Sequence, residues 1–147
     1  MKRISLFLKI LLIILAIGAA ALLVWNKVIN RDKTDASKVE AAKSFTAEEF
    51  MAKVKGDADK PHTKFIDTTF EISGSIDHIS VGKSNADVFF ANGDATMQCS
   101  FLDNYSKDVK GFKKGDEVKL KGRYVGTESD ITSGGVLVQF SNCVIEK

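Results

Sequence analysis

Residue patterns that usually carry catalysis or metal binding are missing from this chain. The two cysteines form no C-x-x-C motif, and no group of cysteine and histidine has the spacing of a zinc site. No phosphate-binding loop occurs, and no motif places a serine or cysteine nucleophile beside a base. His78 follows Asp77, but neighbours in a strand point to opposite faces, so we expect no acid/base pair there. We therefore expect a protein that is not an enzyme and holds no metal or cofactor.

Proline and cysteine are also scarce. The one proline, Pro61, lies in the polar stretch 56–64, which we expect to be a loop. No cysteine lies in or just after the apolar N-terminal segment, so we do not expect a lipid-modified N-terminal cysteine.

The C-terminal part lacks an excess of positive charge, although the whole chain carries +2. Residues 66–147 hold nine basic and twelve acidic side chains, so the basic character comes from the first 65 residues. A nucleic-acid-binding domain usually presents a basic surface, because it has to neutralise phosphates. The charge pattern therefore disfavours a nucleic-acid partner.

The longest apolar run, Ile4 to Trp25, is interrupted only by Ser5 and Lys9. As a helix it spans about 33 Å, enough to cross a hydrocarbon core about 30 Å thick. Trp25, followed by polar residues, resembles an interfacial anchor. We predict a transmembrane anchor over residues 1–25, with 4–25 in contact with the membrane. A cleaved signal peptide with small residues at 18–21 is the alternative.

Basic residues flank this segment on both sides, so the positive-inside count is nearly balanced. Long translocated domains are largely exempt from that count. We predict a single-pass membrane protein whose C-terminal domain is extracytoplasmic, on the periplasmic or cell-surface side.

After the anchor we expect a polar spacer over 26–45, with mixed charge and no packed core. Thr46 and Glu49 form a capping box for a helix over about 47–55, and Phe45 can pack on Phe50 at its start. This helix belongs to a single domain, 46–147, because about 80 further residues suffice for one modest core.

From Thr68 onward, apolar and polar side chains alternate, which predicts strands. The strands cover about 68–80, 87–91, 95–102, 117–126 and 136–146, with a short helix within 103–115. Gly74 marks a site where the first strand can bend, and Asn92-Gly93-Asp94 predicts a hairpin.

The order of these elements, β-β-β-α-β-β, is that of an OB-fold, a five-stranded Greek-key barrel. The predicted fold class is therefore all-β with accessory helices. The barrel occupies 68–147 and follows a short helix and an N-terminal transmembrane helix.

Four segments resemble the bacterial OB-fold family labelled tRNA_anti-like. They are FEISGSI at 70–76, CSF at 99–101, KGDEVKLKGR at 114–123 and FSNCVI at 140–145. The resemblance implies a small OB module, often anchored in the bacterial envelope and often without an assigned function. One departure is that residues 56–67 are more polar than the link that precedes strand one in the family.

The two cysteines fall on the expected third and fifth strands, which are neighbours in an OB barrel. A disulfide between Cys99 and Cys143 is one prediction, because an extracytoplasmic compartment permits it. Cys143 is out of phase with inward-facing Val138 and Phe140 unless a bulge at 141–142 shifts the register. Two buried free thiols are the alternative.

Five residues make a candidate ligand face. Phe89 and Phe90 occupy both faces of the second strand, and Lys119, Lys121 and Arg123 form a basic stripe on the fourth. An exposed aromatic ring beside cations can stack bases or sugars. The alternative is that strand four has an ordinary solvated face and that the helix at 47–55 covers the outer phenylalanine.

We therefore predict a membrane-anchored, extracytoplasmic OB-fold binding module, with a protein, peptide or glycan of the envelope as its ligand. The alternative is a nucleic-acid-binding OB domain tethered to the cytoplasmic face. A C-terminal reporter that is active only outside the cytoplasm distinguishes them.

Overall fold

The computed structural model describes residues 6–31, 36–56, 64–129 and 134–146. The chain divides into two compact units, Met1–Thr34 and Asp35–Lys147. Most of the predicted loop at 56–64 lies outside the described residues.

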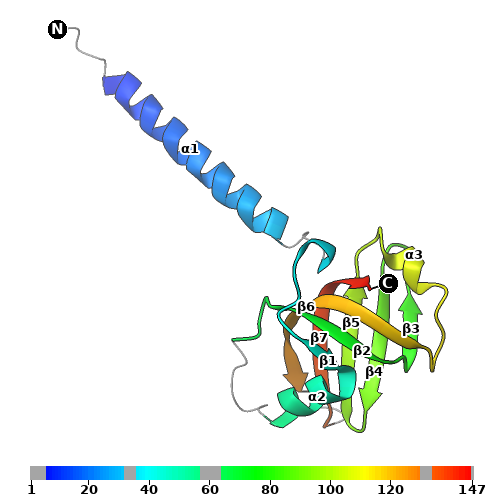
Figure 1. Cartoon of the computed structure of the whole chain (residues 1–147). Helices are drawn as coiled ribbons and strands as arrows, with labels where there is room; N and C mark the ends of the chain where they lie inside the picture. The colour runs from blue at the N-terminus through cyan, green and yellow to red at the C-terminus, as the bar shows by residue number, and fades with distance from the viewer. Residues whose placement is uncertain (1–5, 32–35, 57–63, 130–133, 147) are drawn as a thin grey trace. The chain divides into compact units, whose positions relative to one another are not determined.

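The described part of the first unit is a single helix, α1 (Leu6–Arg31), shown in blue in Figure 1. Its apolar side chains between residues 13 and 25 are exposed, Leu22 by 71% and Trp25 by 69%. Over the part of the chain that the structure describes, no helix combines the length and the apolarity needed to cross a bilayer. The anchor over 4–25 therefore stays a prediction.

The second unit is mostly β-sheet with a few short helices. Its strands form one curled sheet in the order β1-β2-β6-β7-β5-β4-β3, and α2 lies at one end of it (Figure 1). This arrangement confirms the predicted all-β class with accessory helices, and its curled sheet agrees with an OB-like barrel. The elements are η1 (Ala36–Lys38), β1 (Ser44–Thr46), α2 (Ala47–Gly56), β2 (Thr69–Ser75), β3 (His78–Val81), β4 (Ala86–Asn92), β5 (Ala95–Phe101), α3 (Ser106–Val109), β6 (Glu117–Ser129) and β7 (Val136–Ile145).

The prediction of five strands is wrong in number, because over the described residues the sheet has seven strands and its two end strands do not pair with each other. The expected first strand is divided at Ile76-Asp77. The Ile76 N–H donates to the Asp116 carbonyl beside β6 (3.0 Å), whereas the Asp77 N–H donates to the Phe89 carbonyl of β4 (2.8 Å). The chain changes pairing partner at this point, so the predicted strand becomes β2 and β3.

Gly74 serves close packing more than bending, since β2 continues through it to Ser75. A Cβ at this position would meet the Ala47 Cβ at 3.2 Å and the Phe90 ring at 3.3 Å. The glycine thus lets α2 approach the sheet.

The strand β1 was not predicted. It lies at the end of residues 26–45, which were expected to be a polar spacer without a packed core. It pairs in parallel with β2, so that Phe45 lies opposite Ile72. The Ala42 N–H donates to the Thr69 carbonyl (2.9 Å), and Ala36 is buried. Backbone hydrogen bonds hold this edge strand, which is why its polar composition did not reveal it.

The predicted capping box at the start of α2 is confirmed. The Glu49 N–H donates to Thr46 Oγ1 (3.1 Å), and the Thr46 N–H donates to Glu49 Oε2 (3.0 Å). The rings of Phe45 and Phe50 lie 5.5 Å apart, as the expected contact at the helix start requires.

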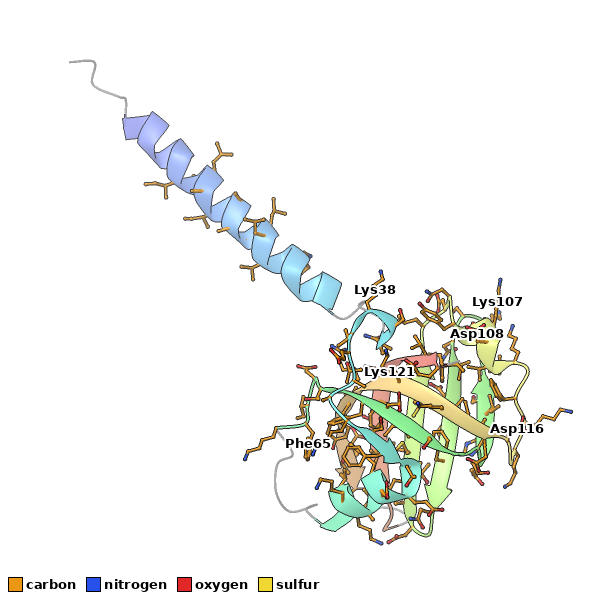
Figure 2. All side chains as sticks on the ribbon, in the orientation of Figure 1. Lys38, Phe65, Lys107, Asp108, Asp116 and Lys121 are labelled. Atoms are coloured by element: carbon orange, nitrogen blue, oxygen red, sulfur yellow. The ribbon has the colours of Figure 1, made fainter. Side chains whose placement is uncertain are left out.

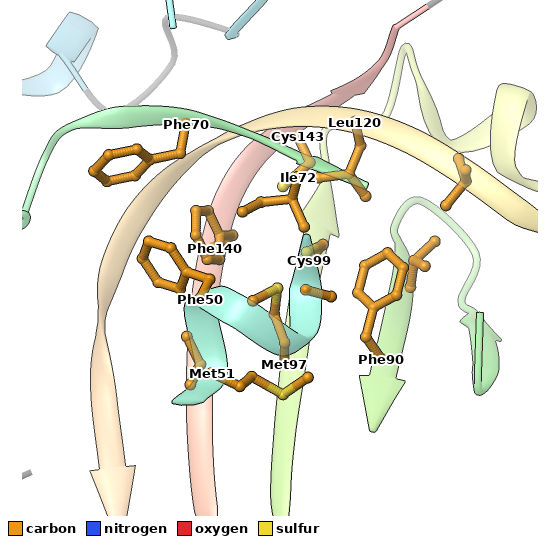
Figure 3. Packing of buried hydrophobic residues seen from close by; sticks show 14 of the residues in the cluster. Phe50, Met51, Phe70, Ile72, Phe90, Met97, Cys99, Leu120, Phe140 and Cys143 are labelled. Atoms are coloured by element: carbon orange, nitrogen blue, oxygen red, sulfur yellow. The ribbon is translucent and has the colours of Figure 1, made fainter. Parts of the chain in front are cut away.

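Aromatic side chains connect α2 with the sheet in the core (Figure 3). The Phe50 ring centre lies 5.1 Å from that of Phe140 on β7 and 5.4 Å from that of Tyr124 on β6. Val118, Leu120 and Tyr124 face inward along β6 as their alternation predicts. The outward residues of the same strand are therefore the ones available for surface contacts.

Candidate ligand-binding surface

The predicted basic stripe, Lys119, Lys121 and Arg123, lies on the outer side of β6. Lys119 Nζ lies 2.9 Å from Glu71 Oε1 on the neighbouring strand β2. The hydrogen bond from Lys119, helped by one from Ser44 Oγ (2.7 Å), lowers the pKa of Glu71 below its ordinary value. The carboxylate therefore stays charged beside Lys119, the first cation of the stripe.

The other two cations of the stripe also face carboxylates. Lys121 Nζ lies 2.9 Å from Glu146 Oε1, and only 14% of the Lys121 side chain is exposed. Arg123 Nη1 lies 3.5 Å from Asp67 Oδ1, and its Nε donates to Ser141 Oγ (3.4 Å). Each cation of the stripe is thus paired within the domain, so the stripe is not a free basic surface.

The two neighbouring phenylalanines of β4 have different environments. Phe90 is buried in the core together with Met51 of α2. Phe89 is half-buried on the outer face, and its ring stacks on that of His78 with centres 4.1 Å apart and planes 7° from parallel. Helix α2 therefore packs with Phe90 in the core. It was expected, as the alternative, to cover the outward-facing phenylalanine, which is Phe89.

The expectation that His78 and Asp77 point apart is wrong. His78 Nδ1 lies 3.0 Å from Asp77 Oδ2, because the chain bends between β2 and β3. This contact and a hydrogen bond from Lys114 Nζ (3.0 Å) lower the pKa of Asp77. Among the described residues, no group of three His, Cys, Asp or Glu side chains is placed to hold a metal ion.

Strand pairing creates a surface that was not expected from the sequence. His78 of β3 lies opposite Phe89 of β4, Phe89 opposite Gln98 of β5, and Gln98 opposite Gln139 of β7. We name these four residues the cross-strand row. Directly opposed side chains share one face of a sheet, so the row presents two stacked rings beside two amides. Only the register could reveal it, because its members lie on four strands.

The cysteines illustrate how a bulge changes which residues meet. The β5–β7 register shifts between Cys99, opposite Phe140, and Phe101, opposite Cys143, and Asn142 has a left-handed φ of 54°. The shift turns Cys143 into the core, where both thiols are buried (Figure 3). Both are free in the structure, so the disulfide stays a prediction. Burial, together with the neighbouring Cys99 thiol, raises the pKa of Cys143 well above its ordinary value.

Comparison with known proteins agrees with this architecture. A family model described as tRNA_anti-like matches residues 1–139. No curated protein matches the chain. A candidate nucleic acid-binding lipoprotein from Klebsiella pneumoniae has a similar crystal structure, with a TM-score of 0.56 and 16% identity. The match covers 71% of this chain and 91% of that one, and at this identity it supports the fold alone.

Two aminoacyl-tRNA synthetases match this chain over about a fifth of their own length. A candidate aspartyl-tRNA synthetase from Leishmania major matches with a TM-score of 0.47 and 10% identity. The match covers 76% of this chain but 22% of that enzyme. Aspartyl-tRNA synthetase from Entamoeba histolytica gives a TM-score of 0.43 and 11% identity, over 56% of this chain and 19% of the enzyme.

Proposed function

The chain belongs to the tRNA_anti-like family, and from this premise we propose that it is a binding module and not an enzyme. Its ligand is a neutral polar molecule of the cell envelope, a protein segment or a glycan. The ligand contacts the outer face of β3, β4, β5 and β7. The cross-strand row is the observation that carries this proposal.

The chemistry of the row suits such a ligand. The stacked rings of His78 and Phe89 form a flat surface against which a sugar ring or an apolar side chain can pack. The amides of Gln98 and Gln139 each donate and accept hydrogen bonds, as peptide groups and hydroxyls require. OB-folds bind oligonucleotides and oligosaccharides on the face of their second and third strands, which correspond here to β4 and β5.

The charge around the row favours a neutral ligand over a polyanion. Lys119, Lys121 and Arg123 are paired with carboxylates, so binding a phosphate there would break an existing ion pair. Asp87 is two residues from Phe89 on the same strand and lies opposite Ser100. A polyanion would therefore meet a carboxylate on the strand that carries Phe89.

Nucleic acid remains the second candidate ligand. The name of the similar Klebsiella pneumoniae protein supports it, since that protein is described as a candidate nucleic acid-binding lipoprotein. It predicts salt-dependent binding of a single-stranded oligonucleotide that is lost when Lys119, Lys121 and Arg123 are all changed to alanine. Salt-independent binding, or none, would argue against it.

We further propose that residues 4–25 attach the module to the membrane, with the C-terminal unit outside the cytoplasm. The exposed apolar side chains of α1, such as Leu22 and Trp25, support this because water alone is a poor environment for them. A C-terminal reporter that matures only outside the cytoplasm tests the orientation. If this reporter is inactive, and a C-terminal reporter that works only in the cytoplasm is active, the orientation is the reverse of the proposed one.

Photo-crosslinking in living cells tests the binding face directly. A benzophenone-bearing amino acid replaces Gln98 in the full-length chain, and Lys107 on α3 serves as the matched exposed control position. We expect adducts with protein or glycan from position 98 and none from 107. Phe89→Ala should remove most of the adduct, because the ring supplies much of the contact area.

Two results would contradict the proposed face. One is the same adduct pattern from positions 98 and 107. The other is an adduct at position 98 that nuclease treatment removes, which would favour the nucleic-acid alternative.

A further inference from the structure

A cavity lies between β1, α2 and the start of β2, on elements that do not contribute to the cross-strand row. Its volume is about 330 Å³. This is at the lower end of the range for small-molecule sites, so its ligand would be small. Lysine and phenylalanine make up most of its wall: Lys43, Phe45, Lys53, Lys64, Phe65 and Phe70. We name these six residues the lysine pocket.

The phenylalanines form the apolar part of the pocket. Phe70 is buried, and its ring centre lies 5.8 Å from those of both Phe45 and Phe65. The two contacts are edge-to-face, with interplanar angles of 65° and 71°. Phe45 and Phe65 are only partly buried, and Figure 2 shows Phe65 on the segment before β2. An aromatic ring entering the cavity would extend an existing edge-to-face network.

The lysines give the pocket its positive charge. Lys43, Lys53 and Lys64 are exposed, and within the described part of the chain none of them pairs with a carboxylate. Lys55, two residues further along α2 than Lys53, does pair with Asp94. Three like charges around an apolar cavity repel one another, and a bound anion would relieve that repulsion.

From this combination we propose that the lysine pocket is a second binding site, for a small anion with an aromatic body, such as an aromatic carboxylate. The ammonium groups hold the charged group of the ligand at the rim, and the ring system lies against the phenylalanines. The site goes beyond the proposed function, because the cross-strand row takes a neutral ligand on other strands.

Isothermal titration of the full chain in lipid nanodiscs with 2-naphthoate tests the site, with empty nanodiscs as the blank. We expect saturable binding at one site per chain. Changing Lys43, Lys53 and Lys64 together to alanine should weaken it at least about tenfold. Lys55→Ala is the matched control and should leave it within about twofold. Circular dichroism verifies that both variants are folded.

Three further ligands separate the parts of the proposal. 2-Naphthamide keeps the rings without the charge, octanoate keeps the charge without the rings, and inorganic phosphate is an anion alone. Each should bind at least about tenfold more weakly than 2-naphthoate. No saturable binding of 2-naphthoate, or equal binding by the triple variant, would overturn the site. Equal binding of octanoate would overturn the assignment of an aromatic ligand.

Discussion

Two groups of three cations in the C-terminal unit have opposite surroundings. Lys119, Lys121 and Arg123 on β6 each face a carboxylate, whereas Lys43, Lys53 and Lys64 surround an apolar cavity without such a partner among the described residues. The first group joins β6 to its neighbours in the fold. The second group surrounds the site that we propose for an anion. A cationic pattern in a sequence therefore says little about binding until its counter-charges are located.

The largest expected effect is in thiol reactivity, at Cys143 of β7, whose sulfur lies in the core close to Gly122 of β6. Cys143 is buried and its pKa is raised, so in the folded chain its thiolate is both scarce and inaccessible. We expect maleimide labelling of the folded full chain to be at least about a thousandfold slower than labelling in denaturant. Mass spectrometry counts the labelled thiols.

The same experiment decides the disulfide. Unreduced, unfolded chain should take up two labels if the thiols are free as in the structure, and none if Cys99 and Cys143 are bonded. Rapid labelling of the folded chain would contradict the buried position of Cys143.

Gly122, between the cations of β6, should be the position of that strand most sensitive to a small change. A Cβ there would meet Cys143 Sγ at 2.5 Å. We expect Gly122→Ala to lower the free energy of unfolding by about 1–3 kcal/mol, as overpacking of a core does. Urea titration measures this. Gly111→Ala is the control, because nothing lies within 4 Å of an added Cβ there.

A second substitution isolates the cause of that loss. Combining Gly122→Ala with Cys143→Ala removes the clashing sulfur and should make the two changes less than additive. Strict additivity would mean that the sulfur is not the obstacle.

Single lysine substitutions test the comparison between the two groups directly. Lys121 is largely buried against Glu146, so Lys121→Ala should lower the free energy of unfolding by about 1 kcal/mol, through lost packing and an unpaired carboxylate. Lys53→Ala should change it by less than about 0.5 kcal/mol. Urea titrations of both variants measure these changes. An equal loss of unfolding free energy in the two variants would contradict the difference between the two groups of cations.

The smallest expected effect is in the pH dependence of stability. The folded-state pKa of Glu71 is lowered, so its contribution is fully present above the unfolded-state pKa and is lost as the pH falls through the folded-state pKa. Glu71→Gln should therefore flatten the acid side of the curve of unfolding free energy against pH. Glu48→Gln, on the exposed side of α2, is the control. An unchanged curve for Glu71→Gln would mean that the Lys119 contact is negligible in solution.

Local signals in the sequence predicted much of the fold. The capping box at Thr46, the hairpin at Gly93 and the alternation along β6 all depend on residues within a few positions of one another. The short helix that was expected within residues 103–115 is present as α3, between β5 and β6. Such features are decided by neighbouring residues, so a single sequence is enough to find them.

Long-range pairing accounts for what was missed. Lys119 meets Glu71 from a strand 48 positions earlier, and the cross-strand row depends on four strands in register. The edge strand β1 is held by backbone hydrogen bonds, which composition does not encode. Cys143 faces the core because of a bulge in β7. The sequence showed that such a bulge would be needed, but not that it is present. The lysine pocket combines residues of three segments and gave no local signal.

The most direct test of the contrast measures two triple alanine variants side by side, one for each group of cations. Titration with 2-naphthoate reports binding, and urea titration reports the free energy of unfolding. The account predicts that the Lys43, Lys53 and Lys64 variant loses binding and keeps stability, while the Lys119, Lys121 and Arg123 variant loses stability and keeps binding. The reverse pattern, or equal effects on both quantities, would contradict it.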